Sequence, residues 1–179
     1  MFAWILVFAC SSTPKYERES LVESFQLLHR PIYGVYQLGV ERNEIHELLE
    51  HSFTGRALTA EYIRHFTALV HMQREQTAID IRQLSYNSFE VLDQAPGRVR
   101  MDVDWSVGGI VTHKAHKHTR INRYRAVYTL LETAKGWRFS DTRMRNLERI
   151  RRADDDEIFE VLARTKYKEN IYRDGFEMI

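Results

Sequence analysis

The sequence predicts an α+β fold in which N-terminal helices pack on a curved, four-stranded antiparallel sheet. Before Thr77 the apolar residues recur at intervals of three and four, which is the helical period, and after it they recur at every second position, which is the strand period. The segments between the predicted strands are short, as an antiparallel meander requires. With 179 residues, 44% of them apolar and 28% charged, the chain is long enough for one globular domain with a single core.

The helical half contains three clear apolar stripes. In chain order they are Leu21 with Phe25 and Leu28, Ile45 with Leu48 and Leu49, and Ile63 with Phe66 and Val70. Pro31 interrupts the first pattern, and Gly55 is predicted to end the helix that carries the second. We expect Thr59 to cap the third helix and its stripe to face the core.

Four strands follow, at residues 77–92, 98–113, 116–132 and 137–147. We expect the α+β domain to occupy residues 15–150. Residues 151–179 are predicted to form a C-terminal helix that starts near Asp154, followed by a tail with Tyr167, Tyr172 and Phe176.

A two-residue turn at Lys114 and Ala115 would fix the register of the two central strands. The predicted partners on the inner face are Val99 with Leu130, Met101 with Tyr128, Val103 with Ala126, Trp105 with Tyr124, Val107 with Asn122, Gly109 with Arg120, Val111 with His118 and His113 with His116. This face is apolar at one end and polar at the other. It predicts a pocket with Trp105, Tyr124 and Tyr128 deep inside and with Arg120 and Asn122 at the mouth.

Two alternatives to the pocket remain open. The same gradient of polarity is expected where a sheet face simply runs out of the core into solvent. Gly108 and Gly109 could give Arg120 room to lie across the strand, or they could mark a β-bulge that shifts the register beyond them.

The segment around the turn contains the densest group of candidate metal ligands, His113, His116 and His118. His116 and His118 share a strand face, and His113 joins them across the turn, so three neutral imidazoles could hold zinc or copper. The cluster could instead be an ordinary polar turn. It could also bind an anion, since Lys114 and Lys117 lie beside it.

Composition and motifs exclude several classes of protein. The formal net charge of +1 argues against a dedicated nucleic-acid binder. The single cysteine, Cys10, excludes an internal disulfide framework and zinc modules that need two or more thiolates. The sequence has no GxSxG, P-loop, HExxH or dinucleotide fingerprint, so we assign no catalytic residue.

The segment from Met1 to Cys10 is apolar and uncharged, but it is too short for a bilayer-spanning helix, which needs about 20 residues. We interpret residues 1–14 as a signal-peptide-like or lipoprotein-like segment, or as part of a membrane anchor, with Cys10 as the candidate lipidation site. Each of these interpretations places the domain in the cell envelope or periplasm. A buried start of a strand or helix is the alternative.

The order of elements, together with Gly136 to Asp141 (GWRFSD), resembles the nuclear transport factor 2-like superfamily over roughly Glu17 to Arg149. The segment from Trp105 to Tyr128 is similar to a stretch in bacterial envelope proteins of this type. The resemblance implies a cone-shaped cavity between the helices and a bent sheet. Members include isomerases, dehydratases, ligand-binding domains and assembly modules. Their acid-base enzymes commonly place an Asp–His pair inside the cone, whereas this sequence puts no Asp on the inner face of the central strands.

We therefore expect a non-catalytic envelope domain that binds a small ligand or a metal ion at the polar mouth. One alternative is a cofactor-independent lyase or isomerase of the SnoaL type, in which a histidine is the base and Tyr124 or Arg120 polarises a carbonyl. Another is a protein–protein assembly module that docks through the aromatic tail. The chain could also attach to a membrane through its N-terminus or form a homodimer. We expect no nucleic-acid partner.

Overall fold

The computed structural model describes residues 16–38, 42–114 and 116–150. Within these ranges the chain forms helices on one side of a single antiparallel sheet with the strand order β1-β2-β3-β4. The α+β class and the four-stranded meander are therefore confirmed. The predictions for residues 1–14, including Cys10, and for residues 151–179, including the aromatic tail, lie outside the described residues.

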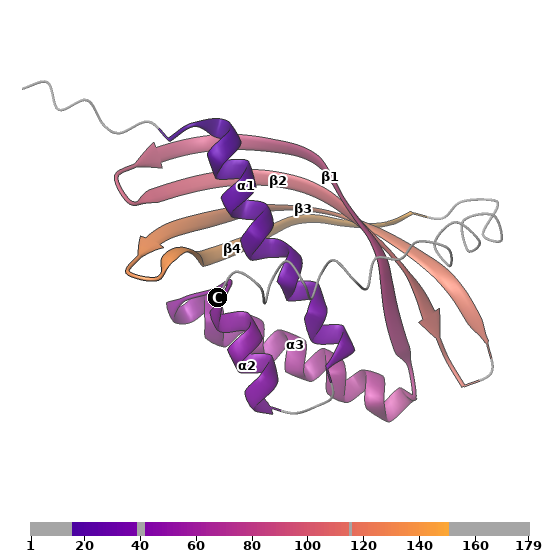
Figure 1. Cartoon of the computed structure of the whole chain (residues 1–179). Coiled ribbons are helices and arrows are strands. Elements are labelled where there is room, and N and C mark those ends of the chain that lie inside the picture. Colours follow the sequence, from indigo (N-terminus) through magenta and orange to yellow (C-terminus); the bar gives the residue numbers. More distant parts are fainter. Residues whose placement is uncertain (1–15, 39–41, 115, 151–179) are drawn as a thin grey trace, which may run out of the picture.

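The helices are α1 (Arg18–His29), the 3-10 helix η1 (Arg30–Gln37), α2 (Arg42–Glu50) and α3 (Gly55–Glu75). Figure 1 shows α1, α2 and α3 gathered on one side of the bent sheet, with β1 curving down beside the end of α3. Pro31 does not break the chain direction, because it lies in the first turn of η1, where its missing N–H costs no helical hydrogen bond. No helix among the described residues is long and apolar enough to cross a bilayer.

The start and the buried face of α3 differ from the prediction. The helix begins at Gly55, which has a positive φ of 59° and follows Thr54, so neither the end at Gly55 nor the cap at Thr59 was right. Ile63 is 58% exposed and Val70 is 40% exposed. The buried residues of α3 are instead Ala57, Glu61, His65 and Leu69. The apolar pattern predicted the wrong buried face, because the face of α3 that is buried lines a cavity that contains polar groups.

The strands are β1 (Ala78–Ala95), β2 (Arg98–Thr112), β3 (Lys117–Thr133) and β4 (Gly136–Ile150). The predicted register of β2 and β3 is confirmed over its whole length, including Trp105 opposite Tyr124 and Gly109 opposite Arg120. At the turn, the backbone N–H of His113 donates to the carbonyl of His116 at 2.9 Å. The even-numbered residues of β3 therefore share the inner face with the odd-numbered residues of β2.

The irregularity near Gly108 and Gly109 lies on the neighbouring strand. The pairing of β1 with β2 shifts between Ile81 and Gln83, opposite the two glycines, while the β2–β3 register continues without a shift. A Cβ atom on Gly109 would lie 2.7 Å from the carbonyl oxygen of Asp80. Glycine is needed here because the backbone of β1 approaches too closely for any side chain.

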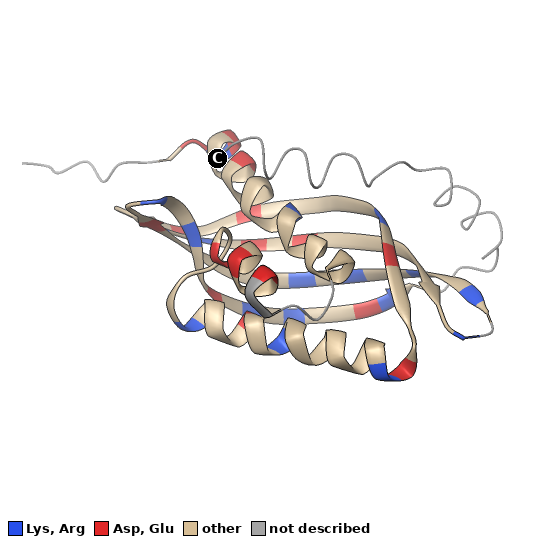
Figure 2. Cartoon of the chain, turned by 60° about the horizontal axis from the view of Figure 1, so that its bottom comes forward, with Lys and Arg blue, Asp and Glu red and all other residues tan. Residues whose placement is uncertain are grey.

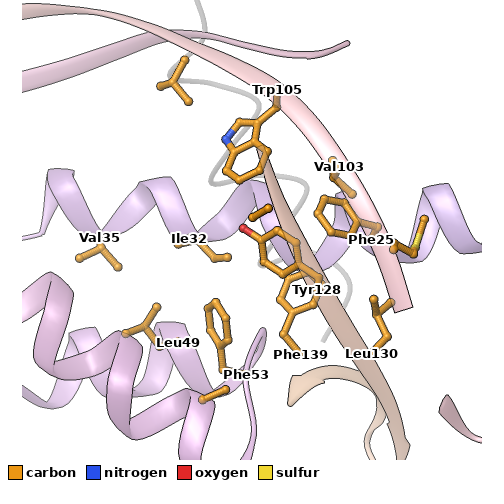
Figure 3. Close-up of a cluster of buried hydrophobic side chains, with 14 of the residues drawn as sticks. Phe25, Ile32, Val35, Leu49, Phe53, Val103, Trp105, Tyr128, Leu130 and Phe139 are labelled. Carbon is orange, nitrogen blue, oxygen red and sulfur yellow. The ribbon is translucent and has the colours of Figure 1, made fainter. Parts of the chain in front are cut away.

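The core fills the space between α1 and one half of the inner sheet face. Figure 3 shows Phe25, Trp105, Tyr128 and Phe139 close together in this layer, with Phe53 beside Phe139. All five are at most 4% exposed. The rings meet mainly edge to face or tilted, for example Phe25 and Tyr128 with centroids 5.0 Å apart at 85°. This aromatic layer closes one end of the space under the sheet, and the other end is hollow.

Candidate functional site

A cavity of about 560 Å³ lies between the inner face of the sheet and the helices. Its walls come from three parts of the chain: η1 contributes Tyr33 and Tyr36, α3 contributes a row of polar residues, and β2 with β3 contributes the inner face described above. Known small-molecule pockets are of similar volume and also combine apolar walls with a few polar groups.

All five residues predicted to bind a ligand line this cavity, namely Trp105, Arg120, Asn122, Tyr124 and Tyr128. Their side chains form a connected row along the sheet. Trp105 and Tyr124 stack with ring centroids 5.3 Å apart and an angle of 14°. Asn122 Nδ2 donates to Tyr124 Oη at 2.9 Å, and Arg120 Nε donates to Asn122 Oδ1 at 3.3 Å. The row runs from the buried aromatic end of the cavity at Trp105 and Tyr128, which we call the floor, to the exposed guanidinium of Arg120.

The floor contains a buried histidine that the sequence did not single out. His29 Nδ1 lies 3.0 Å from Tyr86 Oη, and Nε2 lies 3.1 Å from Tyr128 Oη. Burial lowers the pKa of His29 to about 3, with a smaller contribution from the positive charge of Arg64. The imidazole is therefore neutral, and one ring nitrogen donates while the other accepts.

Trp105 is held at the floor by a second polar contact. Its Nε1–H donates to Tyr33 Oη at 2.6 Å, and its ring meets His29 edge to face at a centroid distance of 4.8 Å. Burial raises the pKa of Tyr33, so the hydroxyl stays protonated. These contacts fix the indole in one orientation. The single N–H donor of the indole is engaged by Tyr33 and is not available to a ligand.

The wall formed by α3 carries an ionic group that faces the cavity. Arg64 Nε donates to Glu61 Oε2 at 2.8 Å, and a second nitrogen of the same guanidinium also contacts this oxygen. His65 Nε2 lies 3.6 Å from Glu61 Oε2. Burial, reinforced by the charge of Arg64, lowers the pKa of His65 to about 3. Within the described part of the chain, His65 Nδ1 is buried and has no hydrogen-bond partner.

Sequence reasoning missed this wall because it looked for an apolar stripe. One signal was available: Ala57, Glu61, His65 and Leu69 follow one another at intervals of four, so a Glu and a His lie between two small or apolar residues on the same helix face. Tyr36, which meets His65 edge to face at 5.6 Å, comes from η1 and lacks a local signal.

The three predicted metal ligands form a separate cluster at the tip of the β2–β3 hairpin. One ring nitrogen from each of His113, His116 and His118 lies within 4.8 Å of the others. The ring planes are stacked or only modestly tilted, with centroids 4.9 to 5.7 Å apart. Partial burial, followed by the nearby His113, lowers the pKa of His118. None of the three belongs to the described lining of the cavity.

The outer face of the sheet holds the acidic residues of β2. Asp102 accepts from Arg125 Nε at 2.9 Å, and Asp104 accepts from Arg123 Nη2 at 2.7 Å. The hydrogen bonds from Arg123 hold the pKa of Asp104 below its usual value. Figure 2 shows basic and acidic residues interspersed along the strands in this way. As predicted, these carboxylates point away from the cavity, and they are neutralised by arginines on the neighbouring strand.

Comparison with protein-family models finds no match, and no curated protein matches the chain. Among solved structures, the chain is similar to the crystal structure of the intermembrane space region of the chloroplast protein ARC6, with 15% sequence identity and a TM-score of 0.48. The similarity covers 73% of this chain and 98% of that chain.

Proposed function

We propose that this chain is a non-catalytic small-molecule-binding domain with a nuclear transport factor 2-like cone. The observation that carries the proposal is the cavity of about 560 Å³, whose aromatic floor is held by the hydrogen bonds of His29 and Trp105 to tyrosine hydroxyls and whose sheet wall ends in the exposed Arg120. An occupant should therefore have an apolar, ring-containing body and one anionic or hydrogen-bond-accepting group.

The anionic group is expected at Arg120. This side chain is exposed and, within residues 16–38, 42–114 and 116–150, donates one long hydrogen bond, to Asn122 at 3.3 Å, which leaves most of its five donors for a ligand. Arg64, on the opposite wall, is already paired with Glu61. The ring body would lie against Tyr124 and Trp105, whose stacked faces extend the row inward.

The state of the pocket histidines favours binding over catalysis. A general base works best when its pKa lies near the operating pH. His29 and His65 both have pKa values of about 3, and both nitrogens of His29 are engaged by tyrosines. Both imidazoles are therefore weak bases near neutral pH.

The test is binding of 1-anilinonaphthalene-8-sulfonate, which has an aromatic body and one anionic group. We expect saturable fluorescence enhancement by the full chain, with about one probe per chain. Arg120→Gln should weaken binding about tenfold, the range of a charge-assisted hydrogen bond. Arg143→Gln is the matched control, because Arg143 is also an exposed strand arginine but pairs with Val127 on the outer face.

Equal loss in the two arginine variants would point to non-specific attraction to positive charge and would refute the site. Tyr124→Leu supplies a second measure, since it removes the stacked ring and keeps the apolar volume. Unchanged affinity in this variant would place the probe outside the cavity.

One observation favours a lyase or isomerase as the second candidate. Glu61 and His65 lie together on the cavity wall, and His65 Nδ1 is buried without a partner in the described part of the chain. If the chain is an enzyme, turnover of small carbonyl compounds should be abolished by His65→Gln and by Glu61→Gln. Turnover that survives both substitutions would remove this candidate.

The envelope location is proposed from the apolar segment at Met1 to Cys10 alone. Palmitate labelling of the full chain expressed in bacteria should give a labelled, membrane-associated product, and Cys10→Ser should abolish the label. A soluble periplasmic product without label would support the signal-peptide interpretation, and a cytoplasmic product would refute both.

A further inference from the structure

We infer that the tip of the β2–β3 hairpin is a site for a divalent transition-metal ion of the zinc or copper class, held by His113, His116 and His118. The site is separate from the cavity proposed to bind an organic molecule and does not depend on it. The inference starts from the geometry of the hairpin.

The β2–β3 register brings the three imidazoles to one place. His118 lies on the inner face opposite Val111, and His113 and His116 face each other across the turn, where their backbones are joined by a hydrogen bond. One ring nitrogen of each lies within 4.8 Å of the others. Among the described residues, this is the one group of three or more potential ligands that meets this distance.

To bind one ion the three rings must approach and also turn, because nearly parallel imidazole planes do not aim their lone pairs at one point. Zinc–nitrogen bonds of 2.0–2.1 Å in a tetrahedron place two ligand nitrogens about 3.3 Å apart, so the atoms must close by at most about 1.5 Å. His116 is exposed and His113 and His118 are half-buried, so their side chains can turn without opening the core.

A further contact orients one of the ligands. His113 Nδ1 lies 3.1 Å from Oγ1 of Thr77, the residue before β1. When Nδ1–H donates to this hydroxyl, Nε2 keeps its lone pair for the metal, which is the usual way in which a neighbouring group fixes a ligating histidine. Figure 1 shows this hairpin tip beside the first residues of β1, so the contact ties two segments together at the site.

The ligand atoms and the charges around them indicate which class of ion the site would bind. Three neutral nitrogens suit zinc and copper, whereas magnesium and calcium prefer oxygen ligands. Lys114, Lys117 and Arg120 add positive charge on the same hairpin, and Arg149 adds it from β4. This charge weakens the binding of a cation, so we expect moderate affinity, with the fourth position open to water or an anion.

The experiment is titration calorimetry of the full chain in a Cys10→Ser background with zinc chloride, and with magnesium chloride as the hard-ion control. We expect about one zinc per chain and no heat with magnesium. His116→Ala and His118→Ala should each lower zinc affinity at least tenfold, while His51→Ala, which removes an exposed histidine on the helical side, should leave it unchanged.

Copper electron paramagnetic resonance gives a second readout, because the hyperfine pattern reports the nitrogen ligands directly. The wild-type spectrum should show several imidazole nitrogens, and the pattern should change in His118→Ala. Absence of zinc uptake by the wild type, or uptake that persists in the His116→Ala, His118→Ala double variant, would overturn the inference.

The metal site and the organic pocket can fail independently. Arg120→Gln should weaken the binding of anilinonaphthalene sulfonate, yet it should preserve or increase zinc affinity, because it removes a positive charge two residues from His118 on the same strand face. Loss of both activities in this variant would show that the two sites are one and would overturn the separate metal site.

Discussion

Histidines occur at both ends of the inner sheet face, and the two ends differ in nearly every respect. His29, at the floor, is 1% exposed, stacks on Phe25 and has both nitrogens engaged by tyrosine hydroxyls. At the hairpin tip, His116 is exposed and contacts mainly other imidazoles. The same residue type is therefore a buried structural element at the floor and the proposed set of metal ligands at the tip.

The comparison shows that burial and partners, rather than residue type, decide what a histidine does. At the floor, desolvation removes the charged form and the hydroxyls consume the hydrogen-bonding capacity, so the imidazole stabilises the fold. At the tip, His116 is exposed to solvent, and the contact of His113 with Thr77 engages one of its two ring nitrogens. Substitutions and pH changes at the two ends should therefore have effects of very different size.

The largest effect is expected for His29→Ala. The substitution leaves a cavity and removes one hydrogen-bond partner each from the buried hydroxyl of Tyr128 and the half-buried Tyr86, so we expect a loss of about 3–5 kcal/mol in the free energy of unfolding. Urea denaturation followed by far-UV circular dichroism measures it. His29→Gln, which keeps one donor and one acceptor, should recover part of the loss. A loss below about 1 kcal/mol for His29→Ala would mean that His29 at the floor stabilises the fold no more than a histidine at the hairpin tip.

The next effect is the pH dependence of stability. The folded pKa values of His29 and His65 are about 3, whereas an unfolded histidine titrates near 6.5. Between these values the unfolded chain binds more protons, so the free energy of unfolding should fall as the pH drops below 6.5 and should continue to fall toward pH 3. Each histidine contributes a limiting slope of about 1.4 kcal/mol per pH unit.

His65→Gln tests one of these contributions. Glu61 and Arg64 face His65 from the same helix and Tyr36 from η1, and the substitution keeps a neutral polar group among them. Urea titrations at pH 6.5 to 4.5 should show a shallower slope in the variant than in the wild type. High salt, which screens surface pairs such as Lys135 with Glu50, should leave this difference intact. Identical slopes would show that His65 titrates normally in the folded chain.

The tip was easier to predict from the sequence than the floor, for a physical reason. The β2–β3 register follows from local information, namely a two-residue turn and strict alternation, so it placed Trp105, Arg120 and the three histidines correctly relative to one another. The hydrogen bonds of His29 join residues 57 and 99 positions apart, and no periodicity encodes them. Glu61 and His65 were missed because a helix that lines a polar cavity buries polar residues and exposes Ile63 and Val70.

The smallest effect is expected for His116→Ala in a metal-free buffer with chelator. The side chain is exposed, lies at a hairpin tip and contacts the rings of His113 and His118, so its loss should change the free energy of unfolding by no more than about 0.5 kcal/mol. Parallel urea titrations of His116→Ala and His29→Ala measure the two ends under one condition. A large loss at the tip would mean that the imidazole cluster supports the fold, and its rings would then be structural elements rather than free ligands. A small loss would show that the fold does not depend on the imidazole of His116, which leaves this ring able to serve as a ligand.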